Sequence, residues 1–314
     1  RGQRETGVYT ALASAWHAGG ERVVFLSDLG DRYGLYLLTP GDGTPNLLTN
    51  ESFDVTSKPF VVSPASMIFF QSNEPSPYER QVFRIPDEGG TATRVTTLPG
   101  QHRPYPSPDG TMIALLHNSD LSPPELYLVD TRNGLPENRV TTSPIPEFMR
   151  RSWAQARYAT FPSRIDNYPL HARILEPTDL KPGKRYPVVF GPAYSNTVRN
   201  RWAGTIGLLH QLLVERGYIV IQVDVRGSTG YGREFREEFL IDFGGRDIDD
   251  LESGGNYLST RPYVEPERVG IWGSSHGGTL TIYSLFKKPG LFKAGVAGAA
   301  AVDPYFFGTD DVDI

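Results

Sequence analysis

The chain has 314 residues, of which 31 are Lys or Arg and 36 are Asp or Glu, so its formal net charge is −5. Because it lacks the clustered cations that release counterions from phosphates, we expect no nucleic-acid partner. The absence of cysteine excludes disulfides, thiolate catalysis and cysteine-based zinc sites, and leaves both a cytoplasmic and a periplasmic or secreted location open. The longest apolar runs, such as residues 218–223, are too short to span a bilayer, so we expect a soluble protein that makes no membrane contact.

Three apolar runs in the first half recur with a period of about 45 residues. Their equivalent positions are Val24, Ile68 and Ile113, which are 44 and 45 residues apart. Each run is followed by a second apolar run and by a short third run that ends in threonine, with turns rich in Gly, Asp and Pro between them. This unit is typical of a four-stranded propeller blade, and an antiparallel sandwich with evenly spaced hairpins is the alternative. Since a propeller closes with about four to eight blades, the pattern predicts an incomplete β-propeller over residues 1–144.

Strands alternate with helices in the second half, after a polar, proline-containing linker at residues 145–164. Strands are predicted at residues 173–175, 187–190, 218–223, 268–272 and 294–297. One amphipathic helix is expected to turn Ile206, Leu209 and Leu213 to one face and to end at Gly217, and further helices are expected at 247–258 and 277–288. This alternation predicts a mostly parallel sheet covered by helices over residues 165–314.

A glycine-rich turn with the sequence GSSHGG stands at residues 273–278, between a predicted strand and a predicted helix. It matches the G-x-S-x-G nucleophile elbow, in which a serine on a strained turn projects its hydroxyl above the sheet. The spacing selects Ser275 as the nucleophile and predicts a positive φ for it. The backbone N–H of His276, at the helix N-terminus, would then stabilise an oxyanion. A turn without chemistry is the alternative, which the strand before it and the helix after it disfavour.

Three segments together resemble the prolyl oligopeptidase family of serine peptidases. They are the elbow with its extra glycine at Gly278, the DVRGSTGYG segment at residues 224–232, and the YPVVFGP segment at residues 186–192. The last two are similar to the D-x-R-G-S-x-G-Y-G segment of the family and to the strand and Gly-Pro loop of its oxyanion hole. The resemblance implies a β-propeller followed by an α/β-hydrolase domain. It also implies a serine peptidase that hydrolyses short peptides, while the propeller screens out folded proteins.

The resemblance further implies an oxyanion donor besides His276. Many family members place a tyrosine hydroxyl near the end of the strand that precedes the Gly-Pro loop, but Phe190 stands there in this chain. Either the Tyr194 hydroxyl or a backbone N–H near Gly191 would replace it. The histidine after the nucleophile, His276, resembles the acylaminoacyl peptidase branch of the family more than the dipeptidyl peptidase branch. The aromatic residues implied for the substrate pocket, for which core packing is an alternative, are Tyr231, Tyr305, Phe306 and Phe307.

The catalytic acid and histidine of a triad are missing from the sequence after Ser275. In α/β-hydrolases both follow the serine, but the 39 residues after Ser275 contain no histidine except His276. We therefore expect the chain to be part of a longer enzyme, and to be inactive by itself. The sequence contains no metal or cofactor motif, short peptides are the expected partners, and a homo-oligomer is compatible with these features. A carboxylesterase and a non-catalytic propeller binding protein are the alternative functions.

Overall fold

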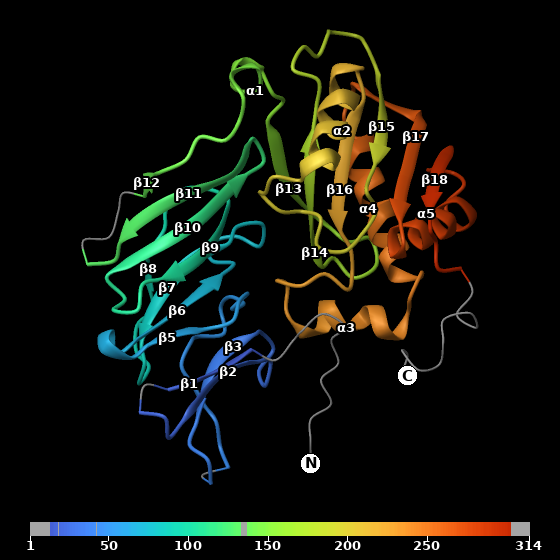
Figure 1. The fold of residues 1–314 in the computed structure, drawn as a ribbon. Coiled ribbons are helices and arrows are strands. Elements are labelled where there is room, and N and C mark those ends of the chain that lie inside the picture. Colours follow the sequence, from blue (N-terminus) through green and yellow to red (C-terminus); the bar gives the residue numbers. More distant parts are fainter. Residues whose placement is uncertain (1–12, 18, 42, 133–136, 303–314) are drawn as a thin grey trace. The chain divides into compact units, whose positions relative to one another are not determined.

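The structure is a computed structural model that describes residues 13–17, 19–41, 43–132 and 137–302 (Figure 1). The chain forms two compact units. The first contains residues 1–151, 199–204 and 229–237, and the second contains residues 152–198, 205–228 and 238–314. No helix of the described residues is both long enough and apolar enough to cross a membrane.

The first unit contains three four-stranded antiparallel sheets (Figure 1). The first is built of β1 (Ser14–Trp16), β2 (Val23–Ser27), β3 (Gly34–Leu38) and β4 (Asn46–Leu47). The second is built of β5 (Phe60–Val62), β6 (Met67–Ser72), β7 (Gln81–Pro86) and β8 (Thr93–Arg94), with a 3-10 helix at Ser63–Ala65. The third is built of β9 (Gln101–Pro106), β10 (Met112–Ser119), β11 (Ser122–Asp130) and β12 (Asn138–Arg139). The predicted repeat is therefore confirmed, because each period forms one sheet, and Val24, Ile68 and Ile113 are fully buried in their second strands.

Neighbouring sheets share their hydrophobic cores through opposite faces of one strand. On β6, Ile68 and Phe70 belong to a cluster that includes Val24 of the first sheet. The residue between them, Phe69, belongs to a second cluster with Ile113 of the third sheet. Successive side chains of a strand point to opposite faces, so the second sheet is packed between the other two. Face-to-face packing of four-stranded sheets is the arrangement of propeller blades.

A threonine extends each blade beyond its short fourth strand. Its hydroxyl accepts the backbone N–H of a residue on the third strand, which lengthens the ladder by one hydrogen bond. The same bond recurs in all three blades, between Thr49 and Leu35 (3.1 Å), Thr96 and Val82 (2.9 Å), and Thr141 and Leu126 (2.9 Å). The threonine that ends each repeat in the sequence thus has a structural role.

The second unit contains a six-stranded mixed sheet in the order β13-β14-β16-β15-β17-β18. Its strands are β13 (Ala156–Pro162), β14 (Pro169–Leu175), β15 (Tyr186–Phe190), β16 (Ile219–Asp224), β17 (Val264–Ser274) and β18 (Ala294–Gly298). The strands β15 to β18 run parallel, whereas β13 and β14 are antiparallel to their neighbours. All six residues of β16 are buried, as expected for a strand covered on both faces. The sheet confirms the predicted α/β-hydrolase class.

The helices are α1 (Pro146–Arg150), α2 (Gly204–Glu215), α3 (Arg233–Ile241), α4 (Arg246–Ser259) and α5 (His276–Lys287). The helices α4 and α5 pack against each other and against β17. Right-handed crossovers between parallel strands put α2 on the opposite face of the sheet from these two helices. At the end of α2, Gly217 has a φ of 84° and its N–H donates to the Val214 carbonyl, which confirms the predicted glycine cap.

The structure differs from the sequence-based prediction in two places. The linker predicted at residues 145–164 contains α1 and β13, which pairs with β14 along its whole length. As an edge strand with little burial, β13 lacks the apolar alternation that would reveal it.

The second difference concerns the buried face of α2. Ile206, Leu209 and Leu213 were expected to form the apolar face of the helix. Leu213 is partly buried, but Ile206 and Leu209 are each 38% exposed, whereas His210 and Gln211 are buried. The Gln211 side chain accepts the N–H of Ala154 (2.9 Å) and donates to its carbonyl (3.0 Å), so a polar residue satisfies the backbone beside β13. Tertiary hydrogen bonding therefore outweighs the apolar periodicity of this helix.

Candidate active site

The elbow serine joins the end of β17 to the start of α5. Ser275 has φ 57° and ψ −127°, it is exposed, and its N–H donates to the Gly298 carbonyl of β18 (2.9 Å). The positive φ predicted from the sequence is present. Such a conformation costs a non-glycine residue roughly 1–3 kcal/mol and persists only where the surroundings enforce it. The sheet edge and the helix start provide that enforcement here.

The glycines around Ser275 are required by close backbone contacts. A Cβ on Gly273 would overlap the Gly277 carbonyl, and a Cβ on Gly277 would overlap the Ala193 carbonyl. A Cβ on Gly278 would lie 2.5 Å from the Gly298 carbonyl. These overlaps involve backbone atoms, which cannot move aside as a side chain can. The contact at Gly277 places the 193–194 loop directly over the N-terminus of α5.

His276 contributes a backbone donor at the start of α5 and a half-buried ring. As the first residue of α5, it has no acceptor within the helix for its N–H. Its ring packs against the rings of Tyr194 (5.2 Å between centroids), Phe239 (5.2 Å) and Phe243 (5.1 Å). Burial lowers the pKa of His276 to about 4, so the ring is neutral at physiological pH.

The loop after β15 offers few backbone donors to the site. The Gly191 N–H donates to the Ile221 carbonyl (2.9 Å), and the Ala193 N–H donates to the Trp272 carbonyl (2.8 Å). Proline at position 192 has no N–H. Phe190 is 1% exposed and packs edge-on against Phe292, with the ring centroids 5.2 Å apart. The half-buried Tyr194 is the residue of this loop that lies beside His276.

The expected pocket residues are only partly covered by the structure. Tyr231 is 6% exposed and packs against Phe235 (5.3 Å between centroids) and under the Arg199 guanidinium (6.0 Å), all within the first unit. Its place in a substrate pocket stays a prediction. Tyr305, Phe306 and Phe307 lie outside the described residues, and their predicted role stays open.

Within the described part of the chain, no histidine or carboxylate hydrogen-bonds the Ser275 hydroxyl. Of the six histidines, His17, His102 and His117 lie in the first unit. In the second unit, His171 on β14 is 3.2 Å from the Thr160 hydroxyl, and His210 is buried on α2. The described residues therefore include the strand, turn and helix of the predicted elbow, and among them no base lies beside the Ser275 hydroxyl.

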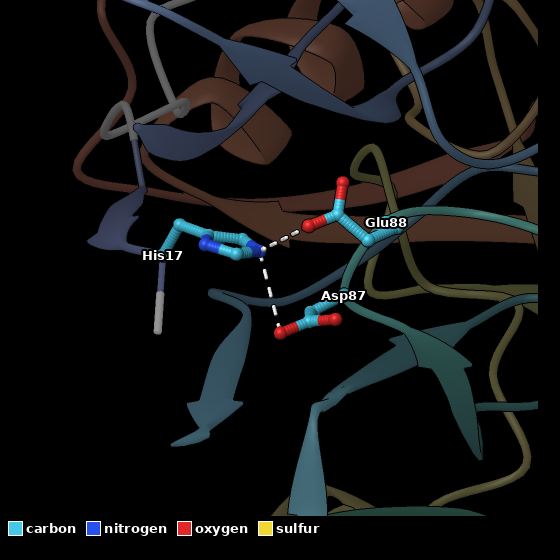
Figure 2. Close-up of side chains that lie close together, drawn as sticks. All are labelled: His17, Asp87 and Glu88. Atoms are coloured by element: carbon cyan, nitrogen blue, oxygen red, sulfur yellow. Dashed lines mark ion pairs between the residues drawn. The ribbon is translucent and has the colours of Figure 1, made fainter. Parts of the chain in front are cut away.

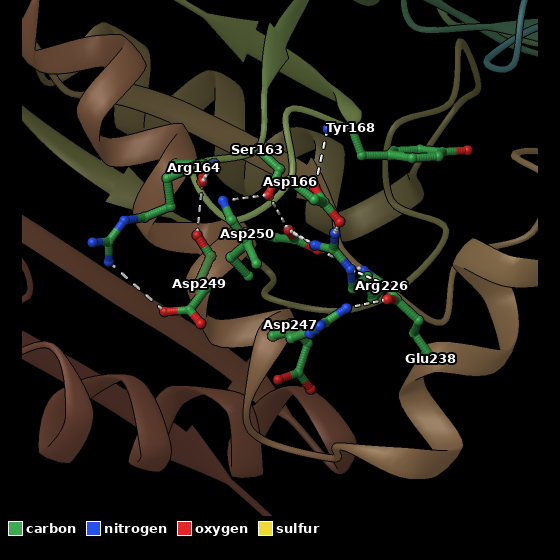
Figure 3. Close-up of polar contacts among 12 residues, drawn as sticks. Ser163, Arg164, Asp166, Tyr168, Arg226, Glu238, Asp247, Asp249 and Asp250 are labelled. Carbon is green, nitrogen blue, oxygen red and sulfur yellow. Dashed lines mark hydrogen bonds and ion pairs between the residues drawn. The ribbon is translucent and has the colours of Figure 1, made fainter.

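A buried arginine of the DVRGSTGYG segment forms an ionic network with three carboxylates (Figure 3). Arg226 is 1% exposed, and its guanidinium pairs with Asp166, Glu238 and Asp250. Its backbone N–H also donates to Asp250 (2.9 Å). Although burial alone would lower the pKa of the guanidinium, these carboxylates raise it, so Arg226 stays charged. The sequence analysis singled out this segment only for its resemblance to the family and did not reveal these partners.

One group of side chains in the first unit has the composition of a metal site (Figure 2). Nε2 of His17 lies 3.3 Å from Asp87 and 3.6 Å from Glu88. However, the Arg22 guanidinium pairs with Glu88 and lies 3.2 Å from Nε2 of His17. Arg22 thus supplies the positive charge that a metal ion would bring, and the cluster links the first two blades as an ion-pair network.

Comparisons with known proteins agree with this architecture. Residues 207–313 match the Prolyl oligopeptidase family, and residues 8–124 match the Dipeptidyl peptidase IV (DPP IV) N-terminal region. The chain is 30% identical over 289 residues to the probable dipeptidyl-aminopeptidase B of Emericella nidulans, covering 87% of this chain and 31% of that protein. It is 34% identical over 146 residues to human dipeptidyl peptidase 8, covering 45% of this chain and 16% of that protein.

Two solved structures are also similar to this chain. The structure of Porphyromonas gingivalis dipeptidyl peptidase 4 is similar with a TM-score of 0.82 and 27% identity, over 93% of this chain and 41% of that one. A putative dipeptidyl aminopeptidase IV from Bacteroides ovatus shares the fold, with a TM-score of 0.79 and 22% identity over 92% of this chain and 43% of that one. The chain spans less than half the length of these relatives. Because both family models match in this order and the similarity extends over most of the chain, the chain belongs to the prolyl oligopeptidase family.

Proposed function

We propose that the protein is a serine peptidase that hydrolyses short peptides through an acyl-enzyme at Ser275. The observation that carries this proposal is the strained and exposed conformation of Ser275 at the N-terminus of α5. Close contacts at Gly273, Gly277 and Gly278, where only glycine fits, accompany the φ of 57° at Ser275. In a nucleophile elbow, this strained conformation projects the serine hydroxyl above the sheet.

In this reaction the Ser275 oxygen attacks the carbonyl carbon of the scissile peptide bond, and its proton passes to a general base. The C–N bond then breaks, and the amine leaves with that proton. Water releases the acyl group from the serine by the reverse sequence of proton transfers. His276 is unsuited to be the base, because its half-buried ring packs among aromatic side chains and its pKa is about 4. The base therefore has to come from outside the described residues.

The oxyanion is held by the His276 N–H and the Tyr194 hydroxyl. Of the two donors that the sequence left open, a Gly191 backbone N–H is disfavoured because it already bonds to the Ile221 carbonyl. Tyr194 has a hydroxyl, and its ring contacts His276 at the start of α5. Preorganised donors of this kind are each worth roughly 10²–10³ in kcat.

The relatives favour a particular kind of peptide cleavage. They are named as dipeptidyl peptidases or dipeptidyl aminopeptidases, so we infer that this protein releases dipeptides from the N-termini of short peptides. The histidine after the nucleophile had pointed to the acylaminoacyl branch, but a single residue carries less weight than similarity over 87% of the chain. The blades of the first unit would restrict access to short or unfolded peptides.

The test is hydrolysis of dipeptidyl p-nitroanilides by the full-length protein, alongside N-acetylated p-nitroanilides and p-nitrophenyl esters. Ser275→Ala should abolish turnover, whereas Ser274→Ala, which changes the neighbouring exposed serine, should retain it. Preference for a free N-terminus is expected. Ester hydrolysis without amide hydrolysis would make the protein an esterase, and turnover by the Ser275→Ala variant would refute the nucleophile assignment.

A further inference from the structure

The DVRGSTGYG segment contacts the loop that carries Tyr194. One carboxylate oxygen of Asp224, Oδ1, accepts the backbone N–H groups of Thr197 (2.6 Å) and Val198 (2.9 Å). Four residues later, the Ser228 hydroxyl accepts the N–H of Asn196 (3.1 Å). Asp224 and Ser228 are both buried, with 1% and 0% exposure. The first and fifth residues of the motif thus hold three consecutive N–H groups of the loop.

These bonds leave Tyr194 between two fixed points. On its N-terminal side, the Ala193 N–H is bound to the Trp272 carbonyl (2.8 Å). On its C-terminal side, Asn196 adopts a φ of 59° and is bound to Ser228. Only Tyr194 and Ser195 lie between these anchors, so the backbone that carries the Tyr194 ring has little freedom to move.

The segment is itself held from its other side. Arg226, midway between Asp224 and Ser228, is fixed to Asp250 of α4 through its backbone N–H and its guanidinium. At Gly227, which has a φ of 96°, a Cβ would lie 2.9 Å from Phe239. The buried arginine network therefore fixes the position from which Asp224 and Ser228 hold the loop.

We propose that Asp224 and Ser228 are positioning residues that hold the Tyr194 hydroxyl at the oxyanion. This proposal rests on the proposed function. It accounts for the spacing of Asp224, Arg226 and Ser228 within the motif: two residues face the loop and one faces α4. A displacement of about 1 Å in a catalytic group can cost roughly 100-fold in rate, so loss of the Ser228 anchor should be visible in kcat.

The test is a double-mutant cycle in the full-length protein, with Ser228→Ala and Tyr194→Phe measured singly and together. The readouts are kcat and KM for a dipeptidyl p-nitroanilide and the rate of labelling by a fluorophosphonate. We expect each single variant to lose at least 10-fold in kcat with little change in KM, as when one oxyanion donor is lost or displaced. The double variant should be no slower than Tyr194→Phe alone, because Ser228 acts through the hydroxyl that this variant lacks.

Three further variants separate a positioning role from an effect on general stability. Ser284→Ala makes the same change at another fully buried serine of the second unit, whose hydroxyl has no partner among the described residues, and should keep wild-type kcat. Asp224→Asn should retain most activity, because one amide oxygen can accept both N–H groups that Oδ1 accepts, whereas Asp224→Ala should not.

The experiment distinguishes failure of the positioning proposal from failure of the proposed function. If the wild-type protein is neither labelled nor active, the proposed function itself is refuted. If it is active but the effects of Ser228→Ala and Tyr194→Phe multiply in the double variant, Ser228 does not act through Tyr194 and the positioning proposal is overturned. If Asp224→Asn and Asp224→Ala lose the same factor in kcat, Asp224 is not a positioning residue for Tyr194.

Discussion

The carbonyl oxygen of Ala193 lies directly against the α-carbon of Gly277, leaving no space for a Cβ. This contact packs the loop at residues 193–194 against the first turn of α5. We predict that Gly277→Ala displaces this loop, because the Ala193 carbonyl belongs to the backbone and cannot rotate away as a side chain can. The rate at which a fluorophosphonate labels Ser275 should therefore fall by at least 10-fold. Gly290→Ala is the matched control, because nothing lies within 4 Å of a Cβ there. Equal labelling of both variants would show that the contact is unimportant for the site.

The repeated threonines predict a specific loss of blade stability. Thr96→Val keeps the shape of the side chain but removes the acceptor of the buried Val82 N–H. Leaving that donor unsatisfied should cost about 1–3 kcal/mol. Hydrogen exchange of the β7 amides should therefore accelerate, whereas Thr93→Val, at an exposed position of β8, should leave it unchanged. Unchanged exchange in Thr96→Val would contradict the role assigned to this hydroxyl.

A pair of buried histidines predicts acid sensitivity of the third blade. His102 and His117 lie opposite each other on β9 and β10, with their ring centroids 4.7 Å apart and their planes tilted by 42°. Burial lowers the pKa of His102 to about 4, and it also lowers that of His117. Between pH 6.5 and about 4 the unfolded chain binds a proton at His102 that the folded protein does not. Stability should consequently fall as the pH is lowered through this window, by up to about 1.4 kcal/mol per pH unit for one histidine.

The variant that tests this is His102→Asn, since its amide can replace the bond from Nδ1 to the Arg80 carbonyl (2.9 Å) without titrating. Hydrogen exchange of β9 and β10, measured from pH 7 to 4.5, should depend less steeply on pH after correction for intrinsic exchange. A pH dependence identical to that of the wild type would show that His102 does not titrate in this range.

The buried arginine predicts a large difference between two ion pairs. Arg226→Met leaves buried Asp250 without its cation and should destabilise the second unit by about 3–5 kcal/mol. Arg164→Met removes a half-exposed partner of Glu252 and should cost at most about 1 kcal/mol. Thermal unfolding of the two variants of the full-length protein compares these effects. Similar melting temperatures for both would contradict the stabilising role of the Arg226 network.

Sequence patterns that extend over only a few residues predicted two parts of the structure, the blade repeat and the elbow. The blade repeat followed from apolar residues such as Ile68, and the elbow followed from glycines around Ser275, because both are encoded within a few residues. The proposal of Tyr194 over Gly191 as the oxyanion donor could not be made in this way. It depends on the Ile221 carbonyl, which lies 30 residues along the chain and reaches Gly191 only through strand pairing.

Other features were missed for the same reason. The strand β13 is defined by its pairing with β14, and its own sequence has no clear alternation. The D-x-R-G-S spacing was visible in the sequence, but its partners are N–H groups of the 196–198 loop and carboxylates such as Asp250 of α4, which lie elsewhere along the chain. In each case a tertiary hydrogen bond decides the structure, and no periodicity of the chain reports it.

The central claim, that Ser275 is the nucleophile, is tested most directly by locating a covalent adduct. The full-length protein is treated with a fluorophosphonate, digested, and analysed by mass spectrometry. The account predicts one adduct, on Ser275, that is absent from the Ser275→Ala variant and unchanged in Ser274→Ala. An adduct on Ser274 or on any other residue, or no adduct on a folded protein that cleaves peptides, would contradict it.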